Sequence, residues 1–339
     1  MEDQVVSNQV NGPRENQGKK TIWIILMAVI ALILAGGAYF FLNREAVDTT
    51  SDSASTQDTA DNSPTNEKKS WQEGEVAIAG AFADAEVVDL GDGRYRMYYS
   101  IEPEVEGNQL EMYSALSTDG VSWTIEAGDR KTKATFPDII TLADGSLRMY
   151  FQNERVIKSA TSVDGLVFTD EAGVRIDKQE LGYAIDSVGS QSTMKLSDGS
   201  YLMVYAGTQE NIKYAPNVPN NKIANFFYAT SKDGIVWEKK GLALNSANSI
   251  LEGWVDGAEL VDFDGSTRLY FWGYKGIYYI SYTEGEFSTE PVFDFTNETD
   301  TSRAYPANGP GDPSLVKVKD QWFMYYGQHT KGIYYTILR

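Results

Sequence analysis

The sequence predicts an all-β protein, a five-bladed β-propeller preceded by one N-terminal transmembrane helix. Three observations predict it. A long uncharged apolar segment lies near the N-terminus, a hairpin pattern then recurs five times, and the absence of cysteine leaves a large core, without disulfides, to hold the folded part together. The chain divides into a tail at 1–20, the helix at 21–42, a stalk at 43–70 and the propeller at 71–339.

The N-terminal region predicts a single-pass membrane protein. Residues 1–20 are polar and are expected to be disordered. The segment 21–42 carries no charge, and its 22 residues are enough to cross the hydrocarbon layer of about 30 Å. Lys19 and Lys20 precede it, so the N-terminus is expected in the cytoplasm and the C-terminal domain outside the cell. The alternative is a cleaved signal peptide, which small residues at 35–38 permit.

Composition then separates a stalk from the folded domain. Residues 43–70 are rich in Ser, Thr, Asp and Asn, which cannot build a core, and they predict a disordered stalk. The formal charge of −19 resides in residues 43–339, because the tail and the apolar segment sum to zero. Such an acidic domain argues against nucleic acid, whose phosphates need Lys and Arg. It suits neutral or cationic ligands.

A turn motif repeats five times in the domain, 52 to 66 residues apart. Each turn follows an apolar run and precedes an aromatic-rich run, which is a strong hairpin signal. The turns are Asp92-Gly93, Asp144-Gly145, Asp198-Gly199, Asp264-Gly265 and Asp320-Gln321. A β-sandwich is the alternative fold, but it does not require such similar periods.

A second signature, Ser-x-Asp-Gly-x-x-aromatic, marks the third and fourth strands of three units. It occurs at 117–123, 162–168 and 231–237. The last unit lacks it, while Ser70–Ile78 resembles the strand Trp237–Leu244 that follows the third copy. We therefore expect the N-terminal strand to complete the last unit and close a ring, which leaves only short protected edges. A monomeric propeller is expected.

Acidic residues stand at the head of the first strand in every unit. Those singled out are Asp84, Asp138, Asp186, Asp256, Glu259 and Asp312. The heads of these strands meet around the propeller axis, where carboxylates must share protons, bind a cation such as Ca²⁺, or meet a polar substrate. The alternative is that each Asp caps its own turn. No metal ligand set is assigned.

Aromatic and amide side chains accompany these acids and favour a carbohydrate ligand. Phe82, Phe136 and Trp254 are candidate platforms for a sugar ring, and Gln328 is a candidate partner for hydroxyl groups. His329 is the only histidine, so it is either structural or a contact to substrate or metal.

The domain resembles the furanosidase-type glycosidases of glycoside hydrolase families 43, 32 and 62. The resemblance covers about residues 71–339. The run Asp312-Pro313-Ser314-Leu315-Val316 is similar to the family's Asp-Pro-Ser strand opening, and Phe136-Pro137-Asp138-Ile139 to its Ala-Pro-Asp-Val opening. The Ser-x-Asp-Gly-x-x-Trp signature is also common in that superfamily.

The resemblance implies three carboxylate roles. Carried over by position, Asp84 is the general base, Asp186 orients substrate and tunes the acid, and Asp256 is the general acid. Position 256 holds Asp where the family has Glu, so Glu259 is the alternative acid. The implied chemistry is inverting hydrolysis, in which one carboxylic acid protonates the leaving oxygen and a carboxylate activates water.

The expected function is a membrane-anchored extracytoplasmic glycoside hydrolase acting on an exposed glycan. One alternative is a non-catalytic propeller that binds glycan or a surface partner, and another is a metal-stabilised interaction scaffold. Sialidases need an arginine triad, whereas Arg96, Arg148 and Arg268 occupy repeated positions and are expected to be structural. Glycoside phosphorylases need a basic phosphate pocket, for which the sequence offers no candidate.

Overall fold

The computed structural model describes residues 69–102, 109–179, 182–298, 302–306, 308–328 and 331–339. The predicted tail and transmembrane segment, and all but the last two residues of the predicted stalk, lie outside these ranges. Within the described residues, no helix is long and apolar enough to cross a membrane.

Five antiparallel sheets form the domain, and they are numbered here as blades in chain order. Blade one contains β2 (Phe82–Asp89), β3 (Tyr95–Ile101), β4 (Glu111–Ser117) and β5 (Thr124–Ile125), with β6 (Lys131–Thr132) also beside β4. Blade two contains β7 (Thr135–Thr141), β8 (Leu147–Asn153), β9 (Val156–Ser162) and β10 (Thr169–Asp170). Blade three contains β11 (Ser187–Lys195), β12 (Tyr201–Glu210), β13 (Lys222–Ser231) and β14 (Trp237–Leu244).

The last two blades depart from this regular pattern. Blade four contains β15 (Asp256–Phe263), β16 (Ser266–Gly273), β17 (Gly276–Thr283) and β18 (Glu286–Phe287), with β19 (Val292–Phe295) also paired to β17. Blade five contains β20 (Gly311–Val318), β21 (Gln321–Gly327) and β22 (Gly332–Leu338), and its outer strand is β1 (Trp71–Ala79). Trp71 pairs with Leu338, so the predicted closure by the N-terminal strand is confirmed.

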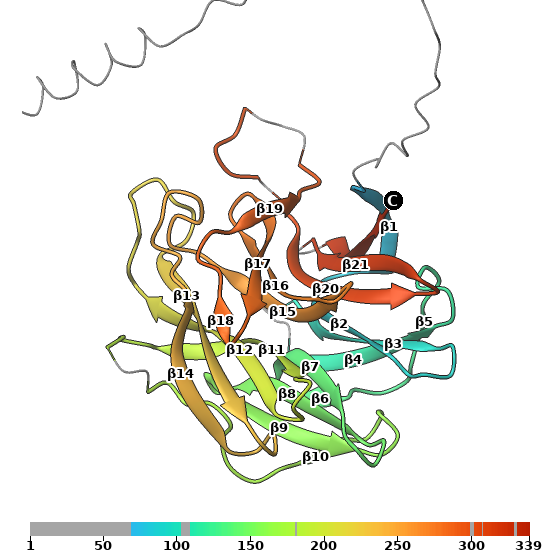
Figure 1. Cartoon of the computed structure of the whole chain (residues 1–339). Coiled ribbons are helices and arrows are strands. Elements are labelled where there is room, and N and C mark those ends of the chain that lie inside the picture. The colour runs from blue at the N-terminus through green and yellow to red at the C-terminus, as the bar shows by residue number, and fades with distance from the viewer. Residues whose placement is uncertain (1–68, 103–108, 180–181, 299–301, 307, 329–330) are drawn as a thin grey trace, which may run out of the picture. The chain divides into compact units, whose positions relative to one another are not determined.

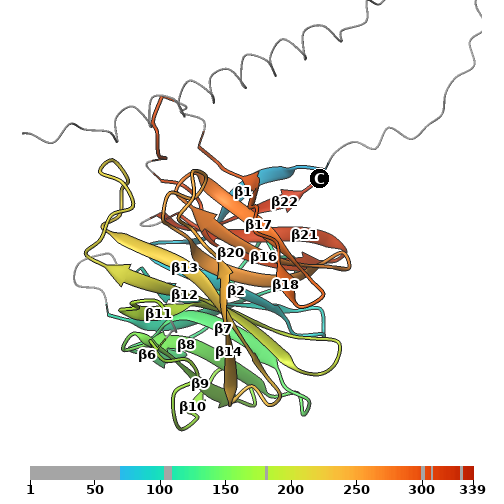
Figure 2. The ribbon, with the colours of Figure 1, turned by 60° about the vertical axis from the view of Figure 1, so that its left-hand side comes forward.

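The blades surround one axis. The innermost strands are β2, β7, β11, β15 and β20; each packs against the next, and β20 packs against β2. In Figure 1 these five strands converge at the centre of the domain, and Figure 2 shows the same ring after rotation. The predicted all-β five-bladed propeller is therefore confirmed.

Every innermost strand contains a β-bulge at the same place. The pairing register shifts there in all five blades. The central residue of each bulge has a positive φ between 47° and 61°. We call this the bulge position, and it is occupied by Asp84, Phe136, Ser190, Gly257 and Asp312. We call the position two residues later the belt position, and it is occupied by Glu86, Asp138, Ser192, Glu259 and Ser314.

Polar clamps join three of the five pairs of neighbouring blades. Second-strand side chains donate to carbonyl groups in the Ser-x-Asp-Gly turn of the next blade. The bonds run from Arg96 and Tyr98 to Asp164 and Gly165, from Arg148 and Tyr150 to Asp233 and Gly234, and from Tyr325 to Gly120. The repeated arginines at 96 and 148 are thus structural, as predicted, while Arg268 stacks on Phe263 and Tyr279 at 4.4 Å from each ring centroid.

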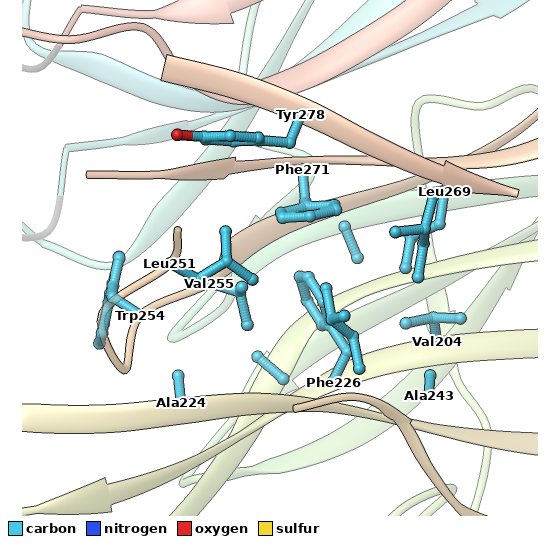
Figure 3. Close-up of a cluster of buried hydrophobic side chains, with 14 of the residues drawn as sticks. Val204, Ala224, Phe226, Ala243, Leu251, Trp254, Val255, Leu269, Phe271 and Tyr278 are labelled. Carbon is cyan, nitrogen blue, oxygen red and sulfur yellow. The ribbon is translucent and has the colours of Figure 1, made fainter. Parts of the chain in front are cut away.

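Apolar packing replaces the clamp between blades three and four. Leu202 and Val204 stand where the preceding blade has Arg148 and Tyr150, and blade four has only a short turn in place of the signature. Figure 3 shows Val204 and Phe226 packed towards Leu269 and Phe271 of blade four. The rings of Phe226 and Phe271 meet edge to face, with centroids 5.4 Å apart. This interface is therefore held by burial of apolar surface.

Removal of one clamp hydroxyl should weaken the ring. The Tyr150 hydroxyl donates to the Gly234 carbonyl at 2.8 Å in a buried setting, so Tyr150→Phe leaves that carbonyl without this partner. We expect the free energy of unfolding in urea to fall by about 1–2 kcal/mol. Tyr278→Phe is the matched control, because this buried tyrosine has ring contacts and no hydroxyl bond among the described residues. Equal losses in the two variants would contradict the clamp.

Candidate functional site

A cleft of about 540 Å³ lies at one end of the propeller axis. The loops that enter the innermost strands form it, together with the loops between the second and third strands. Four carboxylates line it: Asp84, Glu102, Asp256 and Asp312. Five aromatic side chains line it: Phe136, Trp254, Trp272, Tyr274 and Tyr305. Its neutral polar lining includes Gln152, Ser187, Ser190, Thr208, Asn220 and Asn221, and one base, Lys222, stands exposed at the edge.

Two of the carboxylates occupy bulge positions in neighbouring blades. Asp84 is buried and accepts the backbone N–H of Phe136 at Oδ2, 3.2 Å away. Asp312 accepts the indole N–H of Trp272 at Oδ1, 3.1 Å away. Both have a positive φ, which turns them out of the regular alternation of a strand. The bulge is thus the local feature that presents them at the axis.

Burial and like charge keep protons on this pair. Burial raises the pKa of Asp84 to about 7; the charges of Glu102 and Asp256 add to that rise, and the Phe136 N–H opposes it. Burial also raises the pKa of Asp312 well above its usual range, followed by the charges of Asp84, Asp256 and Glu102. Both carboxyl groups are therefore biased towards their protonated forms, and Asp84 is only partly ionised at neutral pH. A carboxyl group that keeps its proton beside one that can lose it suits general acid–base chemistry.

Blade four supplies an aromatic wall beside the carboxylates. Trp254 stacks on Tyr274 with centroids 6.4 Å apart and meets Trp272 edge to face at 6.0 Å. Tyr305, from the segment before β20, meets Tyr274 edge to face at 5.3 Å. Flat apolar faces next to carboxylates and amides are well suited to a sugar ring, which has apolar C–H faces and a hydroxyl edge.

Below the cleft, the belt positions form a closed ring of hydrogen bonds. In each blade the side chain at the belt position accepts the backbone N–H of the residue that follows the belt position in the next blade. The pairs are Glu86 with Ile139, Asp138 with Thr193, Ser192 with Leu260, Glu259 with Leu315 and Ser314 with Val87. We call this ring the belt. It uses three acids for structure rather than for chemistry.

The structure brings some of the predicted site residues to the cleft. Asp84, Asp256 and Asp312 line it, as do Phe136 and Trp254. Their catalytic and binding roles stay predictions, because the geometry establishes only that these side chains share one cleft.

Other predicted residues lie elsewhere. Asp138 and Glu259 belong to the belt and do not line the cleft, and their predicted roles stay predictions. Asp186 is exposed, accepts the Glu210 N–H at 2.8 Å and does not line the cleft. Phe82 packs edge to face on Tyr99, with centroids 5.0 Å apart.

The remaining two candidates, Gln328 and His329, follow β21 in the sequence. Gln328 is buried and donates to the Asn308 carbonyl at 3.5 Å, away from the cleft lining. His329 lies outside the described residues.

The expected equivalence of acids around the ring is wrong. The counterparts of Asp84 at the bulge position are Phe136, Ser190 and Gly257, and only Asp312 is a second acid there. Asp186 stands four residues before the bulge, and Asp256 one residue before it. The bulge position lies eight residues before the turn Asp in four blades and seven before it in blade four, so Asp138, Asp186 and Asp256 do not share it.

Sequence reasoning missed Glu102 and Trp272. Glu102 directly follows β3 as Gln328 directly follows β21, so the loop that supplied Gln328 pointed to the same position in blade one. Trp272 ends an aromatic strand next to Gly273, so its position was available from the same pattern.

The described residues offer no group of three or more His, Cys, Asp or Glu side chains placed to hold a metal ion. Calcium at the axis therefore stays a prediction without support from this geometry.

Comparisons with known proteins bear on the fold. No protein-family model and no curated protein matches the chain. One similar solved structure bears the description that the GH130 family of mannoside phosphorylases contains glycoside hydrolases that target β-1,2 mannosidic linkages in Candida mannan. It has 16% identity and a TM-score of 0.56, covering 81% of this chain and 95% of that one.

Two further solved structures are similar to this chain in fold. A thermostable family-43 glycoside hydrolase has 15% identity and a TM-score of 0.53, with 78% of this chain and 92% of that one covered. A glycosyl hydrolase from Bacteroides ovatus has 15% identity and a TM-score of 0.54, with 76% and 84% covered. The resemblance to propeller glycosidases is thus confirmed at the level of the fold.

The buried acids predict a protein that is more stable at mildly acidic pH. Burial raises the pKa of Asp138 to about 7 and that of Glu259 to about 8, so the folded state binds protons that the unfolded chain has lost. This stabilisation is complete below the ordinary carboxyl pKa near 4 and is lost as pH rises through 7 to 8. Urea unfolding at pH 5 and pH 8 measures it.

Asp138→Asn removes one of these protonation sites and keeps an acceptor for Thr193. We expect it to reduce the loss of stability between pH 5 and pH 8 by on the order of 2 kcal/mol. Asp198→Asn, at an exposed turn, is the control and should leave the pH dependence of the wild type. A wild-type protein that gains stability from pH 5 to pH 8 would contradict the prediction.

A methyl group at Gly257 should displace Asp312. A Cβ there would lie 2.6 Å from the Asp312 Cα and 2.7 Å from its Oδ1. Gly257→Ala should therefore cost at least about 3 kcal/mol of stability and move the Asp312 carboxyl in a crystal structure. Gly265→Ala is matched in its positive φ but has open space around it, so about 1 kcal/mol is expected. Equal losses of stability in Gly257→Ala and Gly265→Ala would argue against close packing of Gly257 on Asp312.

Proposed function

We propose that the chain is a glycoside hydrolase that acts on an exposed glycan from the outer surface of a membrane. The observation that carries this proposal is the axial cleft, where buried carboxyl groups with raised pKa values stand beside an aromatic wall. The fold shared with glycoside hydrolases supports it. The apolar segment at 21–42 supports the anchor.

Asp312 and Asp84 divide the acid and base roles in this proposal. Burial raises the pKa of Asp312 and favours its protonated form, and the Trp272 N–H occupies its Oδ1, which leaves Oδ2 to carry the proton to the leaving oxygen. Asp84, at the position that the family resemblance gives to the base, activates the water. Asp256, the acid implied by the resemblance, becomes a third charge beside the pair. Inversion of the anomeric centre follows from the family resemblance.

The charge of the cleft favours neutral sugars and water as the attacking group. Four carboxylates line the cleft against one exposed base, Lys222. These carboxylates would repel an anionic sugar. Phosphate, the co-substrate of a phosphorylase, would find only exposed Lys222 as a basic partner among the described residues of the lining. One neighbouring structure is described as targeting β-1,2 mannosidic linkages, so mannosides belong in the substrate panel beside arabinofuranosides and xylosides.

A non-catalytic glycan-binding propeller is the second candidate. Asp186 lies outside the cleft and Glu259 is bound in the belt, so two of the implied catalytic carboxylates are not at the site. Saccharide binding measured by calorimetry, with no sugar released from any member of the panel, would establish this alternative.

The hydrolase proposal is tested at Asp84. Asp84→Asn keeps an acceptor for the Phe136 N–H but cannot act as a base, so release of reducing sugar should fall by at least about 10²-fold. Asp198→Asn, at an exposed turn, should keep full activity. Circular dichroism checks that both variants fold, and proton NMR of the first product reports the anomeric outcome. Unchanged turnover in a folded Asp84→Asn variant would sink the assignment.

A further inference from the structure

Glu102 is a buried carboxyl group of the cleft that comes from the end of a second strand, not from the head of a first one. It is 5% exposed and lines the same cleft as Asp84 and Asp312. Its backbone N–H donates to the Ala81 carbonyl at 2.9 Å, which fixes Glu102 beside the start of β2. In the adjoining ladder Ala83 pairs with Ser100. Glu102 and Asp84 therefore sit on neighbouring strands of one blade.

The family resemblance implies a third carboxylate in the proposed reaction. Asp186, the residue it implies, does not line the cleft. The family resemblance gives the tuning role to a residue of blade three, but Asp186 is exposed and bound to the Glu210 N–H. At the corresponding bulge of blade three stands Ser190, which cannot carry a charge and accepts the Gly257 N–H at 2.6 Å.

We propose that Glu102 is the positioning residue that holds Asp84 and Asp312 in their working protonation states, in place of a carboxylate from blade three. This inference rests on the proposed glycoside hydrolase function. Glu102 acts through its charge on the two reacting carboxyls and needs no contact with the scissile bond.

Glu102 is the foremost of the charges that raise the pKa of Asp84, ahead of Asp256. On Asp312 the order is different, because the charges of Asp84 and Asp256 come before that of Glu102. Beneath the pair, Glu86 and Glu259 accept hydrogen bonds within the belt, and burial raises the pKa of both. Among the described residues, the base of the lining is Lys222, exposed at the edge.

The consequence for catalysis follows from the sign of this charge. A negative neighbour disfavours ionisation, so it keeps the proton on Asp312 at higher pH and raises the pH at which Asp84 ionises. Removal of the Glu102 charge lets both Asp84 and Asp312 lose their protons at lower pH. The alkaline limb of the pH–rate profile then moves to lower pH, because that limb reports loss of the proton donor.

The test uses Glu102→Gln in the full chain, which keeps the size of the side chain and removes its charge. We expect the alkaline limb of kcat/KM to move down by about one pH unit, with activity at its new optimum reduced less than 10-fold. Glu154→Gln is the matched control, since Glu154 lies in the corresponding loop of blade two but is exposed and does not line the cleft. Glu102→Asp, which restores a charge, should restore much of the profile.

A second measurement separates this inference from the hydrolase proposal. Carbon-13 NMR of aspartate-labelled protein follows the carboxyl of Asp84 with pH, the signal being assigned by its absence in Asp84→Asn. Its pKa should fall by about one unit in Glu102→Gln and stay unchanged in Glu154→Gln. A shifted carboxyl titration without turnover of any glycoside would retain Glu102 as the tuning group and overturn the hydrolase. An unshifted titration and an unshifted profile would overturn the role of Glu102.

Discussion

The belt is the interaction on which the rest of this propeller depends. The innermost strand of each blade is a sheet edge, so its axis-facing N–H groups have no strand to pair with. One side chain from the preceding blade accepts such a group at each of the five steps around the axis. Carboxylates fill three of these positions and serine hydroxyls the other two. The same bonds that satisfy the edges also fix the rotation of each blade against the next.

Much of the acidity that marks this axis in the sequence is therefore architectural. Asp138 and Glu259 reach a backbone N–H of the next blade, and burial holds protons on them near neutral pH. The carboxylates available for chemistry lie one layer higher, at or beside the bulge. Asp84 and Asp312 turn into the cleft there because a positive φ reverses the regular alternation, and Gly257 leaves the room that Asp312 needs. The acids at the bulge position and those at the belt position, two residues apart in sequence, thus lie in different environments.

The repeat was readable from sequence because it is local. Asp-Gly turns, aromatic strands and the Ser-x-Asp-Gly signature are each encoded within a few residues. They predicted five blades and closure by the segment at 70–78, which the structure shows as β1. The layer of each acid was missed, although in four blades the bulge position lies eight residues before the turn Asp and the belt position six. A bulge shifts alternation by one residue without a characteristic residue type, since Asp, Phe, Ser and Gly all occupy it. The loop before β11 also places Asp186 outside the cleft, and loop shape is not a local property of sequence.

The irregular interface between blades three and four explains why the cleft has its aromatic wall on one side. Blade four lacks the signature turn, and blade three lacks the Arg and Tyr that would bind such a turn, so apolar side chains fill this interface. Trp254 and Tyr274 belong to that same buried cluster and also line the cleft. An aromatic surface intended for a ligand must be held rigid without polar bonds to its faces. The absence of a polar clamp and the presence of the aromatic wall are therefore two aspects of the same apolar packing.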